Sequence, residues 1–127
     1  MAMKVQLEVT PDKYLPHRYA GASGDFNPIH IDPEFARQVG LPSNILHGLY
    51  SMAQVARACT QAAGGDPRSL RRLSVQFRGM GFPEQQITVS GEERESGDGT
   101  VTLALTAEQG GKKIIKNGEA ELRAPKG

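Results

Sequence analysis

The sequence predicts a single α+β domain, in which one long helix packs against an antiparallel sheet of about five strands. Two observations support this prediction. Apolar residues recur at helical spacing over residues 45–63, and several alternating segments follow them, separated by glycine turns. The 127 residues fit one domain, residues 1–127, and they contain no internal repeat and no linker.

The first third of the chain predicts a strand followed by short elements. Residues 13–23 indicate a short helix or turn, and residues 21–31 indicate a loop, because glycines and a proline occur there. A helix should begin at Asp32-Pro33-Glu34, which offers a capping residue and a proline at the first helical position, and it should end at Gly40. The strand is predicted from the alternation of Val5, Leu7 and Val9 with polar residues.

The long helix is predicted over residues 45–63. Ser43 or Asn44 is the expected N-cap, and Gly64-Gly65 should end the helix. Its apolar residues recur at steps of three and four, so we expect them to form the stripe that faces the sheet. This stripe consists of Ile45, Leu49, Met52, Ala56, Cys59 and Ala63.

The rest of the chain predicts strands joined by hairpins. Turns are expected at Gly97-Asp98-Gly99 and at Gly110-Gly111, where glycine permits the backbone angles of tight hairpins. The segments between them have the apolar, β-branched composition of strands. The strand residues are Leu73, Val75 and Phe77, then Ile87–Val89, then Val101–Leu105, and finally Ile114 through Leu122.

Composition excludes several classes of protein. The formal net charge is +1, whereas nucleic-acid binding usually shows as a strong basic excess. The single cysteine, Cys59, rules out an intrachain disulfide, and we place it in the core rather than in a reactive site. No apolar run is long enough to span a bilayer, and no signal peptide is recognised. We therefore expect a soluble, cytoplasmic protein with no nucleic-acid or membrane partner.

The segment from Ser23 to His30 has the highest density of residues that can carry out chemistry. Its sequence Ser-Gly-Asp-Phe-Asn-Pro-Ile-His places an acid, an amide and an imidazole within six positions. Adding water to an activated double bond requires a base for the water and an acid for carbon. A carboxylate and an imidazole, here Asp25 and His30, can do both on one water. The alternative is that Asp25, Asn27 and His30 are only turn residues.

Two other features of the sequence bear on this chemistry. His47-Gly48 lies near a predicted helix start, where free N–H groups can stabilise charge on a substrate oxygen. We expect a structural role for His47 itself, while a place in the pocket stays open. No metal site is predicted, because one Asp and one His five residues apart are too few ligands and no Cys or His cluster completes a set.

The run from Tyr19 to His30, followed by His47-Gly48-Leu49, resembles the (R)-specific enoyl-CoA hydratases, also called MaoC-like dehydratases. The resemblance covers nearly the whole chain. It implies a hot-dog fold, in which a long central helix is wrapped by an antiparallel sheet. It also implies an enzyme of lipid and fatty acid metabolism that hydrates a trans-2-enoyl thioester to the (R)-3-hydroxyacyl thioester, or catalyses the reverse dehydration. No cofactor is implied beyond the coenzyme A or acyl carrier protein that carries the acyl group.

The resemblance also assigns roles to residues of this chain. Asp25 and His30 match the pair that activates the water, and Asn27 matches a supporting amide. Gly48 matches the helix-start residue whose N–H binds the thioester oxygen, and Ser51 is a further supporting candidate. The family's sites lie at a subunit interface, so a homodimer is expected, with a heterodimer or heterotetramer containing a related hot-dog subunit as the alternative.

Other functions and sites are kept open. An acyl-CoA thioesterase is the main alternative, because the same fold hosts thioester hydrolysis. Thioesterases generally place their acid on the long helix, and residues 45–63 contain no Asp or Glu. A third possibility is a non-catalytic subunit. His17 is expected at the surface. Basic residues after the long helix either form a solvated face or bind the phosphates of coenzyme A; the candidates are Arg71, Arg72 and Arg78.

Overall fold

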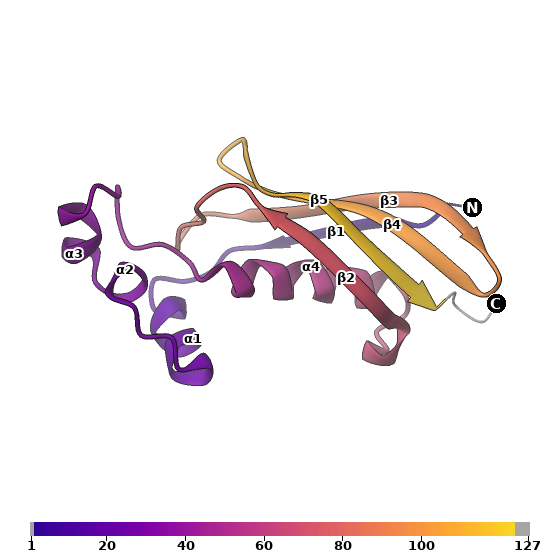
Figure 1. Cartoon of the computed structure of the whole chain (residues 1–127), viewed down its shortest axis with the longest axis horizontal. Coiled ribbons are helices and arrows are strands. Elements are labelled where there is room, and N and C mark those ends of the chain that lie inside the picture. Colours follow the sequence, from indigo (N-terminus) through magenta and orange to yellow (C-terminus); the bar gives the residue numbers. More distant parts are fainter. Residues whose placement is uncertain (1, 124–127) are drawn as a thin grey trace.

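The computed structural model describes residues 2–123 and confirms the α+β prediction. A long helix, α4 (Gly48–Ala62), lies along one face of a five-stranded antiparallel sheet (Figure 1). The strands are β1 (Lys4–Val9), β2 (Leu70–Phe77), β3 (Ile87–Gly97), β4 (Thr100–Gln109) and β5 (Lys112–Arg123). Among residues 2–123, no helix has both the length and the apolar character needed to cross a bilayer.

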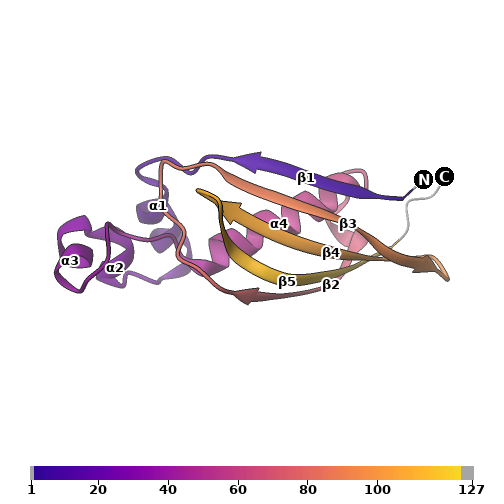
Figure 2. The same cartoon turned by 90° about the horizontal axis from the view of Figure 1, so that it is seen from above.

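The strand order is β1-β3-β4-β5-β2, as Figure 2 shows from above. The three consecutive strands β3, β4 and β5 form the centre, and their hairpins turn at the two predicted positions. Asp98 and Gly99 both have positive φ angles, and so do Gly110 and Gly111, as two-residue hairpin turns require. The strands β1 and β2 form the two edges, and the segment between them carries α4 along one face of the sheet (Figure 1).

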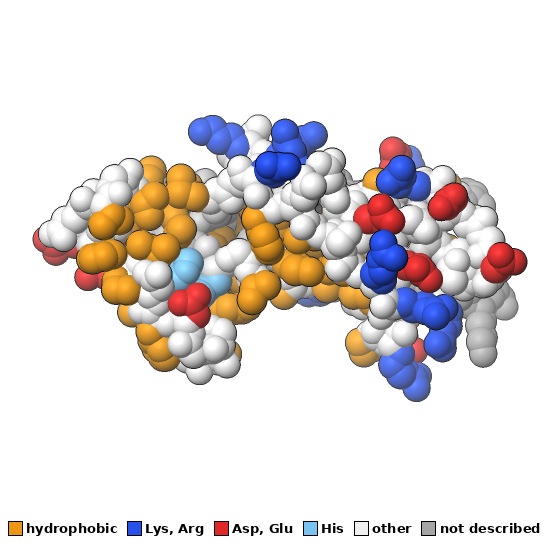
Figure 3. Space-filling view, viewed as in Figure 1, with side chains coloured by type: hydrophobic (Ala, Val, Ile, Leu, Met, Phe, Trp, Pro, Cys, Tyr) orange, Lys and Arg blue, Asp and Glu red, His pale blue; other side chains and the backbone are white. Residues whose placement is uncertain are grey.

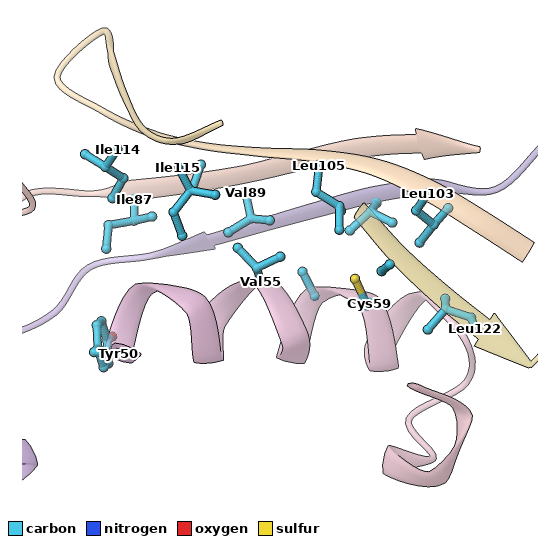
Figure 4. Close-up of a cluster of buried hydrophobic side chains, with 14 of the residues drawn as sticks. Tyr50, Val55, Cys59, Ile87, Val89, Leu103, Leu105, Ile114, Ile115 and Leu122 are labelled. Atoms are coloured by element: carbon cyan, nitrogen blue, oxygen red, sulfur yellow. The ribbon is translucent and has the colours of Figure 1, made fainter. Parts of the chain in front are cut away.

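The core lies between α4 and the sheet (Figure 4). Val55 and Cys59 of the helix point towards strand residues that are fully buried, among them Val89, Leu103 and Leu122. Burial raises the pKa of the Cys59 thiol to about 11, which fits the predicted role of this residue as a small core side chain rather than a nucleophile.

The predicted apolar stripe of the long helix was wrong in all but one of the residues that belong to α4. The buried residues of α4 are Tyr50, Ser51, Val55, Ala58 and Cys59, and all of them except Ser51 belong to the hydrophobic core. Leu49 of the predicted stripe is 61% exposed, and Met52 is only half-buried. Both sets contain residues spaced three and four apart, so spacing alone could not choose between two neighbouring faces of the helix.

The start of this helix also differs from the prediction. α4 begins at Gly48 instead of residue 45, and its N-cap residue is His47, whose side chain makes no capping hydrogen bond. Asn44, one of the two expected caps, instead donates its amide Nδ2 to the carbonyl oxygen of His30 at 2.9 Å. Its short side chain therefore binds a neighbouring segment.

Three short helices precede α4 and lie beyond one end of the sheet (Figure 1). They are α1 (Leu15–Ser23), α2 (Pro28–Ile31) and α3 (Pro33–Gln38), and a 3-10 turn, η1 (Pro67–Ser69), follows α4. The predicted start of α3 is confirmed, since the Asp32 carboxylate accepts hydrogen bonds from Glu34 and Phe35. The loop predicted over residues 21–31 was wrong in part: α1 extends to Ser23 and α2 begins at Pro28.

Two glycines flank Leu105 of β4, one on each neighbouring strand. Gly91 of β3 and Gly118 of β5 are both its register partners. A methyl group added at Gly91 would lie 2.5 Å from the Leu105 Cδ2 atom and 2.6 Å from the Ala104 carbonyl oxygen. The sheet therefore packs Leu105 into space that only glycine leaves free.

We expect Gly91→Ala to destabilise the protein by about 1–3 kcal/mol, because the new methyl group overpacks the sheet against Leu105. Urea denaturation followed by circular dichroism measures the change in unfolding free energy. Gly97→Ala is the matched control on the same strand, since its added Cβ meets no atom within 4 Å. Equal stabilities of the two variants would contradict this account of the Leu105 packing.

Candidate active site

The segment between α1 and α2 holds Asp25 in a fixed turn. Gly24 ends α1 with a φ angle of +81°, a conformation that favours glycine. The Asp25 N–H donates to the Ser23 hydroxyl at 3.2 Å, and the Asp25 Oδ1 atom accepts the Asn27 N–H at 3.2 Å. One carboxylate oxygen is thus occupied by the turn, while Oδ2 takes no part in it.

Asn27 supports the site as the N-cap of α2. Its Oδ1 atom accepts the Ile29 N–H at 3.2 Å. The four-residue helix α2 then carries His30 on its last turn, where the side chain is buried. The amide of Asn27 is therefore occupied in starting the helix that positions the imidazole, in line with the supporting role that the resemblance gives it.

The hydrogen bonds of His30 define its tautomer. Nδ1 lies 2.9 Å from the carbonyl oxygen of Ile45. Because a carbonyl oxygen can only accept, Nδ1 carries the proton and the lone pair is on Nε2. That Nε2 atom lies 3.7 Å from the Asp25 Oδ2 atom. With His30 neutral, both atoms are acceptors and the distance is too long for a direct hydrogen bond, but one water molecule can donate to both.

His47 completes a cluster that local sequence spacing did not reveal. Its Nε2 atom lies 3.0 Å from the Asp25 carbonyl oxygen. Its ring stacks on that of His30, with centroids 3.9 Å apart and an angle of 22° between the planes. The Tyr19 ring also packs against His47, with a centroid distance of 4.7 Å. The histidine is 22 positions from Asp25 in the sequence, so only the fold joins them.

Asp25, His30 and His47 offer three ligand atoms within 4.8 Å of one another. The predicted number of possible metal ligands, one Asp and one His, was therefore too low. The geometry nevertheless suits hydrogen bonding better, because nearly parallel stacked rings direct their lone pairs side by side rather than towards one point. Nδ1 of His30 and Nε2 of His47 are also already bonded to carbonyl oxygens.

A pocket of about 170 Å³ opens beside His30. Gly48 and Ser51, the two predicted supporting residues, both line it, together with Phe77 and Met80. As the first residue of α4, Gly48 has an N–H that no carbonyl of its own helix accepts. A methyl group at position 48 would lie 3.2 Å from the Phe77 ring, so glycine leaves space between the helix start and this ring.

The predicted phosphate-binding arginines occupy two places on β2 and after it. Arg78 follows Phe77 directly and donates to the Gln76 side chain at 2.7 Å. Arg71 and Arg72 lie near the other end of the strand, where Arg72 is 4.0 Å from Glu119. A strand rises roughly 3.3 Å per residue, so Arg72 is about 17 Å from Phe77 along β2. Arg78 is thus adjacent to the pocket, and the other two are distant from it.

The surface around the site is largely apolar. Figure 3 shows histidine side chains in a hollow beside an acidic side chain, with hydrophobic side chains on either side; basic side chains lie along the top of the view and, mixed with acidic ones, towards the opposite end. Large exposed apolar side chains near the site are Phe26, Leu49, Phe77 and Met80. His17 is exposed, as predicted, and takes no part in this cluster. These four side chains come from three separate segments, so the sequence did not reveal that they lie around one site.

The chain was compared with known protein families, sequences and structures. The model of the MaoC like domain matches residues 2–117. The fatty acid synthase subunit beta of Aspergillus oryzae is 39% identical over 107 residues, which are 82% of this chain and 5% of that protein. The peroxisomal enoyl-CoA hydratase 2 of Arabidopsis thaliana is 39% identical over 66 residues, which are 51% of this chain and 21% of that protein. This chain thus spans a small part of these relatives.

Among solved structures, the R-hydratase PhaJ1 from Pseudomonas aeruginosa superposes with a TM-score of 0.89 at 25% identity. The match covers 100% of this chain and 83% of that one. It confirms the hot-dog arrangement of helix and sheet that the resemblance implied. Since the family model covers most of its length and the Ser23–His30 segment lies within the match, this chain belongs to the MaoC-like dehydratase family.

Proposed function

We propose that this protein adds water to a trans-2-enoyl thioester to give the (R)-3-hydroxyacyl thioester, or catalyses the reverse dehydration. The observation that carries the proposal is the 3.7 Å separation of Asp25 Oδ2 and His30 Nε2 at the edge of a pocket. The names of two relatives agree with it, since one is an enoyl-CoA hydratase and the other an R-hydratase. The (R) configuration rests on this family likeness.

The chemistry follows from the positions of the polar groups. A water held by Asp25 and His30 loses a proton to Nε2 as its oxygen bonds to C3 of the enoyl group. Electrons of the double bond move towards the thioester oxygen, where the free N–H of Gly48 and the dipole of α4 stabilise the developing charge. Transfer of the proton to C2 completes the addition. Water is consumed, and no oxidant, reductant or metal is required.

The pocket suits the thioester end of such a substrate. Its polar groups are concentrated at His30, Gly48 and Ser51, while Phe77 and Met80 offer apolar contacts. Ser51 is buried in the first turns of α4, and its hydroxyl faces the pocket as a further hydrogen-bond donor in this proposal. The acyl group is carried by coenzyme A or an acyl carrier protein, and no other cofactor takes part. A cytoplasmic location and a role in fatty acid metabolism belong to the same proposal.

Hydrolysis of the thioester is the competing activity. It is disfavoured because α4 carries no Asp or Glu along its length, whereas the acid and base of this site lie on the segment before it. The two activities differ in their products. Hydration removes the enoyl-thioester absorbance without releasing thiol, and hydrolysis releases one thiol for each substrate consumed.

We expect Asp25→Asn and His30→Ala each to lower kcat with crotonyl-CoA by roughly 10²–10⁴-fold, because each removes one of the two groups that hold and deprotonate the water. Loss of absorbance at the enoyl-thioester band measures turnover, and circular dichroism checks that the variants fold. Asp98→Asn and His17→Ala are matched controls at exposed positions. Full activity in either site variant would remove that residue from the mechanism, and thiol release by the unaltered protein would favour a thioesterase.

The arginines give a separate prediction about the carrier. If Arg71, Arg72 and Arg78 bind the phosphates of coenzyme A, changing each to Ala should raise KM for crotonyl-CoA and leave KM for a short pantetheine thioester unchanged. We expect the largest effect at Arg78, which is nearest the pocket. Steady-state kinetics on both substrates measures the difference. Equal losses on the two substrates would show that these side chains do not contact the phosphates.

A second hot-dog subunit is part of the proposed active form. The exposed apolar side chains Phe26, Leu49, Phe77 and Met80 surround the site and would be covered by a neighbour, and both β1 and β2 are open sheet edges. The partner is a second copy of this chain or a related subunit in a heterodimer or heterotetramer.

We expect the purified protein to have the mass of a dimer in multi-angle light scattering. Leu49→Glu, which places a charge in the apolar rim, should shift it to a monomer and lower activity in parallel. Gln54→Glu is a control on the same helix outside this rim. A monomeric and fully active wild-type protein would contradict the proposed assembly.

A further inference from the structure

We propose that His47 is a positioning residue for this reaction: its Nε2–H holds the Asp25 backbone while its ring supports His30, so that Asp25 and His30 stay aligned on one water. The inference rests on the proposed function and deepens it. The start of the long helix does not require a histidine here, because the His47 side chain makes no capping hydrogen bond.

The first support is the direction of its hydrogen bond. The Asp25 carbonyl oxygen, 3.0 Å from Nε2 of His47, can only accept, so Nε2 carries the proton. Asp25 is then held at three atoms: its N–H by Ser23, its Oδ1 by Asn27 and its carbonyl oxygen by His47. The Oδ2 atom is left to face His30. Among residues 2–123, the bond from His47 is the one hydrogen bond that joins Asp25 to the start of α4.

The second support is the stack of the two imidazole rings. His30 has a proton on Nδ1 and His47 has a proton on Nε2, and each donates it to a backbone carbonyl oxygen. The two hydrogen bonds fix both rings, with their centroids 3.9 Å apart. When His30 takes a proton from water, the charge therefore forms on a ring that His47 holds in place.

The third support is an unsatisfied atom. With the proton on Nε2, Nδ1 of His47 is a bare acceptor, and it has no hydrogen-bond partner among residues 2–123. The side chain is only 3% exposed, so burying this nitrogen costs stability. An apolar ring would fill the same space without that cost. A buried polar atom that lowers stability in this way is expected where function requires its residue.

Three substitutions separate positioning from packing. His47→Phe keeps an aromatic ring and removes the donor. His47→Gln places an amide N–H close to the position of Nε2, while His47→Asn reaches only as far as Nδ1 and is its matched control. We expect His47→Phe to lower kcat roughly 100-fold, the loss that a misplaced catalytic group typically causes, with KM for crotonyl-CoA nearly unchanged. His47→Gln should recover most of this loss, and His47→Asn should not.

Stability distinguishes this role from a merely structural one. The thermal midpoint of His47→Phe should stay close to that of the unaltered protein, because removal of the bare acceptor offsets loss of the hydrogen bond to the Asp25 carbonyl oxygen. Wild-type kcat in His47→Phe would overturn the inference. So would a fall of the thermal midpoint that accounts for the lost activity, or equal recovery by Gln and Asn.

A measurement without substrate tests the geometry itself. ¹⁵N NMR of the unaltered protein should show His47 with its proton on Nε2 and His30 with its proton on Nδ1. The opposite tautomer at His47 would overturn the inference, even if the phenylalanine variant failed to fold. An inactive wild-type protein would instead overturn the proposed function and the positioning role of His47 with it, while the spectrum still decides whether His47 bonds to Asp25.

Discussion

The site depends on how residues 44–46 are bound to the helix that carries His30. The Ile45 carbonyl accepts the His30 Nδ1–H at 2.9 Å, and the Ile45 N–H donates to Ile29 at 2.9 Å. On the far side, the Leu46 N–H donates to Gly81 at 2.8 Å. A four-residue helix such as α2 is not stable alone. These bonds therefore supply its order, and the same contact that holds the helix also leaves the Nε2 lone pair of His30 free.

In the hot-dog fold, residues 44–46 lie at the end of the sheet where the start of α4 and the end of β2 meet. Gly48 at the helix start and Phe77 thus line the same small pocket. Neither group belongs to the Asp25–His30 segment. The sheet and α4 provide a rigid frame, and the three short helices bring the acid and base to it, so one fold supplies both halves of the site.

The predictable parts of this protein are those with local causes. The hairpins follow from Asp98-Gly99 and Gly110-Gly111, whose backbone angles few other pairs adopt, and Asp25 and His30 lie close together because they share one short segment. The buried face of α4 was misjudged because its sequence is apolar on two neighbouring faces, and the second of them bears the exposed Leu49. The contacts of His47 depend on tertiary structure, and the Ile45 carbonyl is a backbone group that no sequence pattern marks.

The unequal burial of the acid and the base is itself informative. The Asp25 side chain is 54% exposed and that of His30 is 11% exposed. Burial holds the imidazole in one orientation, whereas the exposed carboxylate is open to solvent. Bulk water would compete for so open a carboxylate, and it would weaken the electrostatic interactions of the site. The apolar side chains around it, Phe26 and Leu49 among them, form a rim that excludes water only when another surface covers it. Chemistry in this site and assembly of the protein are therefore two consequences of the same exposed rim.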